Sequence, residues 1–293
     1  MKILKLLEGT IKVPEELINQ IMAYVCSDVF SRAVAYLSDP DTADEYYESE
    51  RDIIKLIAKY RKICGDFDIH KDYPVDGSKG ITGTARMSMR ELDNRYFKQN
   101  RATQNKAYAL YVIVHAGKGM SSSGEYTPKR AGSKARVQVI TPNQSVIEEA
   151  TRSPELFDSM LYRIRGVVNH ELMHAVQDMA LNQMSDEDSD SSYYNDDGTL
   201  DDDKYYTHPI EFSPQIVSTA HEFLAFMYQL ENVERLTPEE KKQFILSFVD
   251  PNAKAPRGAN GTLLPFFATL YRKDKVKWKK AAKYFYSLVY NRF

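Results

Sequence analysis

The hydrophobic positions near the start of the chain recur with the spacing of amphipathic helices. A helix is predicted over residues 14–38, because Pro14-Glu15-Glu16 forms a helix start and the apolar residues that follow keep a helical period. The breaker Asp39-Pro40-Asp41 ends it, and a second helix is predicted over about 42–64. Two helices joined by a tight break favour an antiparallel pair. We interpret residues 1–65 as an N-terminal helical extension or lobe.

Shorter apolar runs then predict a small sheet within residues 66–150. The runs at 107–115 and 135–141 are strand-like, and the second alternates cleanly. A further short strand is expected near 85–89. The stretch at 116–134 is interpreted as a mobile hairpin loop, since it is rich in glycine and serine and lacks the spacing of a phosphate-binding loop. An exposed edge of this sheet could hold an extended peptide as an added strand.

The longest helical period begins at Ser153-Pro154-Glu155, which places a capping residue, a proline and an acid where a helix start favours them. Apolar residues then recur at helical spacing as far as Met179, and Gly166 is the one weak point. Further helices are predicted from Ser213-Pro214 and from Thr237-Pro238. The chain is therefore predicted to be an α+β fold that is predominantly α-helical.

Two strongly charged stretches accompany the later helices. Residues 186–204 are rich in aspartate and are interpreted as a solvated loop, with a weak cation site or a cover over a functional site as alternatives. Residues 272–293 are basic, with aromatic residues between the charges. The favoured interpretation is an amphipathic helix that packs Val276, Ala281 and Phe285 and exposes its lysines. The alternative is a tail that binds nucleic acid or a partner.

The long helix carries the motif with the clearest chemistry, His170-Glu171-Leu172-Met173-His174. Residues four apart lie one above the other on a helix face, so His170 and His174 can offer imidazole nitrogens to one metal ion. Two neutral ligands leave room for a water, which Glu171 can deprotonate during attack on a carbonyl. The spacing therefore predicts a zinc site with the chemistry of a peptidase. The structural alternative is a solvated helix face that happens to carry these residues.

A third ligand has to come from elsewhere in the chain. Asp178 shares the helix face, but eight residues at about 1.5 Å each place it about 12 Å from His170 along the axis, which is too far for one ion. The later candidates are His208, Glu211, His221 and Glu222. Glu211 is favoured because it lies where the next helix begins, and a rigid element can direct it back at the motif.

The run from His170 to Asp178, followed later by Glu211-Phe212, resembles a zincin of the gluzincin kind. It is similar to the lethal-factor-like peptidases and to metallopeptidase-like proteins encoded by bacteriophages. The chain departs from the metzincin pattern, because Gln177 and Ala180 stand where that family needs a glycine and a histidine.

The resemblance implies a set of roles for individual residues. Zinc would be held by His170, His174 and Glu211, and Glu171 would act as general base. A tyrosine ahead of the ligand glutamate would stabilise the oxyanion, and that role would fall to Tyr206 or Tyr205. The implied reaction is hydrolysis of peptide bonds in a protein or peptide substrate. The alternative is a catalytically silent protein that keeps the zincin fold as a structural or interaction component, for example of a virion.

The resemblance also implies a zincin-like metallopeptidase domain over residues 66–293. It would comprise a small sheet over 66–150, metal-site helices over 151–232 and C-terminal helices over 233–293.

Composition and charge narrow the expected partners. With 43% hydrophobic residues and a net charge of −2, the 293-residue chain can bury a large core, and nucleic-acid binding over its whole surface is disfavoured. The apolar run at the N-terminus is too short for a secretory signal, and no stretch reaches membrane-spanning length. Cys26 and Cys64 are interpreted as buried thiols of a reducing compartment. We therefore expect a cytoplasmic protein, or a virion-associated one if a phage encodes it, with no membrane partner and an oligomeric state that the sequence does not predict.

Overall fold

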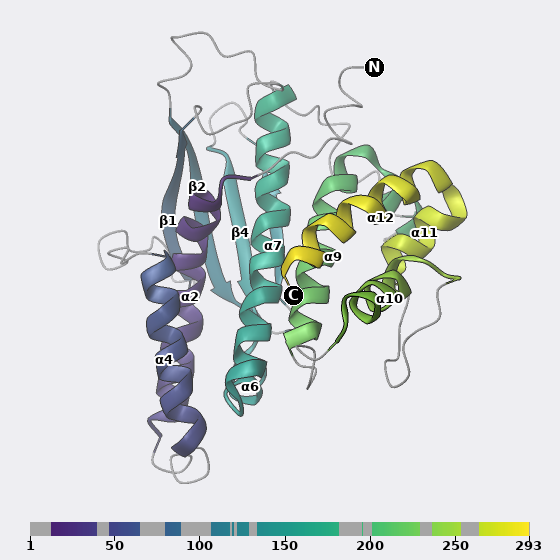
Figure 1. The fold of residues 1–293 in the computed structure, drawn as a ribbon. Helices are drawn as coiled ribbons and strands as arrows, with labels where there is room; N and C mark the ends of the chain where they lie inside the picture. The colour runs from purple at the N-terminus through teal and green to yellow at the C-terminus, as the bar shows by residue number, and fades with distance from the viewer. Residues whose placement is uncertain are drawn as a thin grey trace.

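The computed structural model combines a small mixed β-sheet with helices packed on and beside it (Figure 1). This confirms the predicted class, α+β and predominantly α-helical. The structure describes residues 13–39, 47–64, 80–88, 107–117, 119, 122–128, 134–181, 195, 201–228, 236–252 and 264–292. Across those ranges, no helix combines the length and the apolar character needed to cross a membrane.

The first two described helices, α2 (Glu15–Leu37) and α4 (Tyr47–Cys64), lie side by side (Figure 1). The buried face of α2 packs on the sheet and on α7 (Pro154–Leu181), within one continuous hydrophobic core. The first helix of the expected N-terminal extension thus belongs to the core that supports the sheet. The division of the chain into domains at residue 65 stays a prediction.

The sheet has four described strands in the order β1-β2-β4-β3. Their bounds are β1 (Gly80–Ser88), β2 (Ala107–Ala116), β3 (Ser123–Thr127) and β4 (Arg136–Thr141). Strand β1 pairs antiparallel with β2, and β3 pairs antiparallel with β4, whereas the two central strands are parallel. Strand β1 begins earlier and is longer than the short strand expected near 85–89.

The interpretation of residues 116–134 as a hairpin loop is wrong. Because β2 and β4 are parallel, no hairpin joins them, and the chain between them includes the edge strand β3. The sequence of β3, Ser-Gly-Glu-Tyr-Thr, has no apolar alternation, because the strand is only partly buried. Its pattern therefore carries no strand signal.

Helix α7 lies between the sheet and a second group of helices (Figure 1). On one side it covers the sheet together with α2, after the short helix α6 (Gln144–Ala150). On the other side it packs along α9 (Pro209–Tyr228). A second hydrophobic core joins α9 to α10 (Pro238–Val249), α11 (Pro265–Lys273) and α12 (Lys275–Val289), which a 3-10 turn at Tyr290–Arg292 follows. A site between α7 and α9 is therefore supported by both cores, because α7 packs in the first core and α9 packs in the second.

The start of α9 differs from the prediction. The helix begins at Pro209 rather than at Ser213-Pro214, so Pro214 lies inside it. A helix tolerates an internal proline where another donor replaces its missing N–H. Here the side-chain amide of Gln177 donates to the carbonyl of Ile210, which the N–H of residue 214 would otherwise have reached.

The C-terminal helices follow the prediction more closely. Helix α10 begins at Pro238 after a capping box, as expected. The basic segment forms the amphipathic helix α12, with Ala281 and Phe285 buried, but Val276 is 66% exposed and was wrongly assigned to the core. Most of the acidic stretch at 186–204 lies outside the described residues, and its end forms the start of α8 (Asp202–Thr207).

Candidate metal centre

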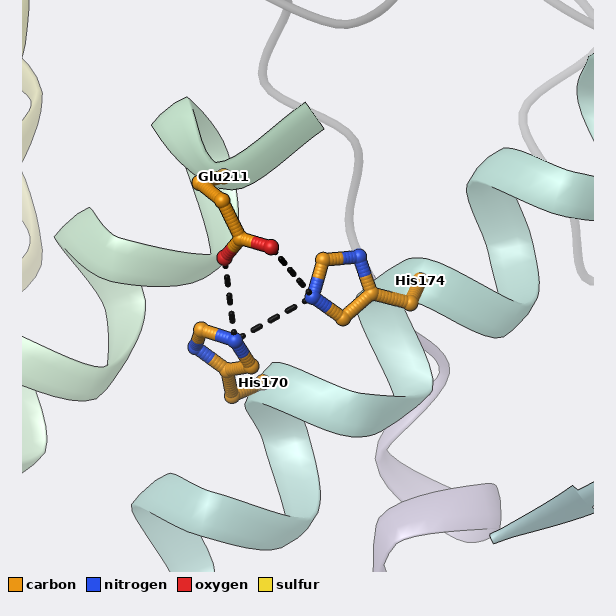
Figure 2. Close-up of side chains that lie close together, drawn as sticks. All are labelled: His170, His174 and Glu211. Carbon is orange, nitrogen blue, oxygen red and sulfur yellow. Dashed lines mark hydrogen bonds and ion pairs between the residues drawn. The ribbon is translucent and has the colours of Figure 1, made fainter. Parts of the chain in front are cut away.

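Two histidines one turn apart on α7 begin the candidate site. The Nε2 atoms of His170 and His174 lie 3.1 Å apart, and both side chains are buried (Figure 2). Two imidazole nitrogens that face each other at this distance repel through their lone pairs unless a proton or a cation lies between them. A positive charge between the two nitrogen atoms would therefore stabilise this arrangement.

Glu211 completes the group from the first turn of α9. Its Oε2 lies 3.3 Å from Nε2 of His170, and its Oε1 lies 3.5 Å from Nε2 of His174 (Figure 2). The close packing of α7 on α9 depends on Gly166, because a Cβ there would lie 2.8 Å from Cβ of His221. The ligand atoms of the three residues lie within 4.8 Å of one another, so the group could hold a metal ion.

The other three candidates for a third ligand do not belong to this group. His221 shares a hydrogen bond between its Nδ1 and the carbonyl of Val217, and burial lowers its pKa to about 4. His208 accepts a hydrogen bond at Nδ1 from the backbone N–H of Ile210. The side chain of Glu222 is exposed. Glu211 is therefore the candidate that the structure brings to the two histidines.

The electrostatics of the group also favour a cation. Burial alone would raise the pKa of Glu211, but the facing histidines hold it well below its usual value. Burial alone would lower the pKa of His174, but the carboxylate of Glu211 outweighs burial and raises it to about 9. Oε2 of Glu211 is buried and accepts no hydrogen bond from the described residues. A buried carboxylate oxygen without a donor needs a compensating charge.

The distances suit a small tetrahedral ion. Metal–ligand bonds of about 2.0–2.2 Å put the ligand atoms of a tetrahedral zinc site roughly 3.3–3.5 Å apart. The three separations here are 3.1, 3.3 and 3.5 Å. Two imidazoles and one carboxylate also leave a fourth position for water or substrate, as in catalytic sites.

Glu171 lies next to the first histidine and faces the edge strand β3. The backbone N–H of Tyr126 donates a hydrogen bond to its carboxylate. The strand comes so close that a Cβ at Gly124 would lie 2.6 Å from Cγ of Glu171. Burial raises the pKa of Glu171, which is the direction expected for a general base that works near neutral pH.

The structure separates the two candidate tyrosines. The Tyr205 side chain lies near the site, where burial and the charges of Glu211 and Glu171 raise its pKa, and the amide of Gln215 donates to its hydroxyl at 2.7 Å. Tyr206 instead packs against Phe266 in the second core, with ring centroids 5.9 Å apart. Of these two tyrosines, Tyr205 is therefore the one that lies beside the candidate centre.

Two side chains that sequence reasoning did not assign support the site. Oε1 of Gln177 lies 3.2 Å from Nδ1 of His174. Asp178, which was rejected as a ligand, accepts a 2.6 Å hydrogen bond from the hydroxyl of Tyr126. Their partners lie on other elements, so no local pattern in the sequence could have identified these roles.

A cavity of about 460 Å³ lies along the part of α7 that precedes the two histidines. Its wall starts at Val167, one turn before His170, and continues through Met160 to Leu156. The exposed side chains of Arg163 and Glu222 also line it. The cavity thus comes within one turn of His170 on α7, and its lining combines apolar side chains with the charged Arg163 and Glu222.

Comparisons with protein-family models, with curated proteins and with solved structures found no match to this chain. The case for its function therefore depends on the geometry of the site.

Proposed function

We propose that the protein is a zinc-dependent peptidase. The observation that carries this proposal is the buried carboxylate of Glu171, directly beside a group of two histidines and a glutamate. A purely structural ion needs ligands but no adjacent base. A base held against an open three-ligand site is what the hydrolysis of a carbonyl compound requires.

His170, His174 and Glu211 would hold the ion, and their nitrogen and oxygen donors suit zinc. When bound, zinc supplies a Lewis acid that polarises a carbonyl and lowers the pKa of water. The burial of all three ligands keeps bulk water away from the charges and so strengthens their interaction with the ion.

The remaining roles belong to side chains around this group. Glu171 takes the proton from the attacking water and passes it to the leaving amine. Tyr205 would donate its hydroxyl proton to the oxygen that gains negative charge. The amide of Gln215 donates to the oxygen of Tyr205, and the hydroxyl of Tyr205 itself donates to the carboxylate of Glu211, which keeps the hydroxyl beside the candidate ligands.

The edge strand supports a peptide as the substrate. The outer edge of β3 pairs with no other described strand, and its Tyr126 turns its N–H toward Glu171 rather than toward β4. Backbone groups alternate along an antiparallel strand, so Gly124 presents its own N–H and carbonyl in the same direction. An extended peptide can add to this edge and place a side chain in the cavity at Val167.

The experiment that tests the proposal compares Glu171→Gln with the wild type, both loaded with zinc. Each protein is incubated with a mixed peptide library, and new termini are detected by mass spectrometry. We expect cleavage by the wild type and a loss of about 10²-fold or more in Glu171→Gln, which keeps its metal. Glu155→Gln, at an exposed position in the first turn of α7, is the matched control and should cleave normally. A zinc-loaded wild type that cleaves nothing, or a fully active Glu171→Gln, would contradict the proposal and favour a silent scaffold.

A further inference from the structure

Gln177 makes two hydrogen bonds in the interior, one to each side of the metal-binding group. Its side chain is 0% exposed, so no bulk water can satisfy the amide. The amide nitrogen donates to the carbonyl of Ile210 at 3.0 Å, and the amide oxygen lies 3.2 Å from Nδ1 of His174. One contact therefore reaches a candidate ligand on α7, and the other reaches the residue directly before the candidate ligand Glu211 on α9.

The orientation of this amide is fixed by its partners. A carbonyl oxygen can only accept, so the NH₂ group of Gln177 has to face Ile210. The amide oxygen then faces His174, and in the neutral imidazole that binds a metal the proton lies on Nδ1. The lone pair of His174 is therefore on Nε2, the atom that points at His170 and Glu211 (Figure 2).

The contact with Ile210 replaces a backbone hydrogen bond that is missing from α9. In a regular helix the carbonyl of Ile210 would accept from the backbone N–H of residue 214. That residue is Pro214, which has no N–H. Gln177 supplies the missing donor from α7, and so ties the first turn of α9, which carries Glu211, to the turn that carries His174.

We propose that Gln177 is a positioning residue for the metal centre, whose single amide sets the tautomer of His174 and the position of Glu211 together. The inference rests on the metal site of the proposed function and does not require peptidase activity. A buried amide with a merely structural role would change folding stability when replaced and leave the metal unaffected.

The test measures metal binding in Gln177→Met, which keeps the length and burial of the side chain but removes both hydrogen bonds. Zinc affinity is measured by competition with a chelator, and cobalt is used as a second probe because its visible absorption reports the ligand geometry. We expect a loss of about 10-fold to 100-fold in zinc affinity, the usual effect of an outer-sphere partner, and an altered cobalt spectrum. Gln177→Glu keeps an acceptor for His174 and should bind zinc more tightly than Gln177→Met.

Two further variants separate positioning from folding. Thr151→Val removes a hydrogen bond of an equally buried side chain, from its hydroxyl to the carbonyl of Glu148, which touches no candidate ligand, so its zinc affinity and cobalt spectrum should match those of the wild type. Pro214→Ala restores a backbone donor for Ile210, so Gln177→Met should lose less zinc affinity in that background. If Gln177→Met does not fold by itself, zinc affinity is compared between Pro214→Ala proteins with and without Gln177→Met.

The outcomes distinguish this inference from the proposed function. Wild-type zinc affinity and an unchanged cobalt spectrum in a folded Gln177→Met protein would overturn the role of Gln177 alone. A wild type that binds neither zinc nor cobalt would overturn both proposals. A wild type that binds zinc but cleaves no peptide, with weakened binding in Gln177→Met, would support the positioning role while the peptidase proposal fails.

Discussion

The hydroxyl of Tyr126 donates a 2.6 Å hydrogen bond to the carboxylate of Asp178, and the backbone N–H of the same tyrosine donates to Glu171. One residue of the edge strand is thus fastened to two turns of α7, on either side of His174. The position of β3 relative to the candidate metal centre is set by this residue.

Tyr126→Phe should destabilise the protein, because the buried carboxylate of Asp178 loses its hydroxyl donor. We expect a decrease of about 1–3 kcal/mol in the free energy of unfolding, measured by urea denaturation. Tyr111→Phe is the control, since Tyr111 alternates with the buried Leu110 and Val112 and so lies on the other face of the sheet. Equal stability of the two variants would show that the Tyr126 hydroxyl does not fasten the strand.

Gly124→Ala should displace β3 from α7. The new methyl group would lie 2.6 Å from Cγ of Glu171 and 2.7 Å from Cγ1 of Val167, so the strand or the glutamate has to move. We expect a loss of about 1–3 kcal/mol in stability from overpacking, and a reduced kcat/KM with zinc retained. Ser123→Ala, at an exposed position of the same strand, should have neither effect. A Gly124→Ala protein that showed the wild-type kcat/KM in the proposed reaction would rule out the close approach as a functional constraint.

His221 should make stability depend on pH between its two pKa values. The folded pKa is about 4, lowered by burial and by the charges of Arg292 and Arg165, against about 6.5 in the unfolded chain. The unfolded state therefore binds more protons in this window, and the contribution, about 3 kcal/mol, is present above pH 6.5 and lost as the pH falls to 4. His221→Asn should lose less stability over that range, as measured by unfolding at each pH. Parallel curves for the two proteins would contradict the assignment.

Zinc binding should release at least one proton at pH 7. In the metal-free protein the pKa of His174 is raised to about 9, so its imidazole is charged at neutral pH and must lose a proton to bind the metal. Zinc affinity should therefore fall about tenfold for each pH unit below 9. Calorimetry in two buffers of different ionisation enthalpy counts the protons directly. Zinc binding with no proton release at pH 7 would contradict a charged His174 in the metal-free protein.

Much of the fold follows from local signals. The helices at Glu15–Leu37, Pro154–Leu181 and Pro238–Val249 match their predictions because each combines a start signal with a long apolar period. Strand β3 could not be predicted, because an edge strand that is only partly buried needs no apolar alternation. The start of α9 was misplaced because Pro214 is typical of a first helical turn, and its actual compensation comes from Gln177 on another helix.

In the candidate site, too, some residues follow from a local pattern in the sequence and others depend on how the helices pack. The spacing of His170 and His174 is a property of any helix, so the sequence predicts that pair directly. Glu211 was the favoured one of four candidates, and the packing of α7 on α9 brings it to the two histidines. Tyr205 and Tyr206 could not be separated, because adjacent helical residues point about 100° apart and only the packed helix decides which one faces the site.

The most direct test of the account is the zinc content of the purified, reconstituted protein by elemental analysis, beside His170→Ala and Glu211→Ala. The account predicts about one zinc per chain in the wild type and a loss of that zinc in both variants, because each removes one of three protein ligands. A wild type without zinc, or full retention of zinc in Glu211→Ala, would contradict it.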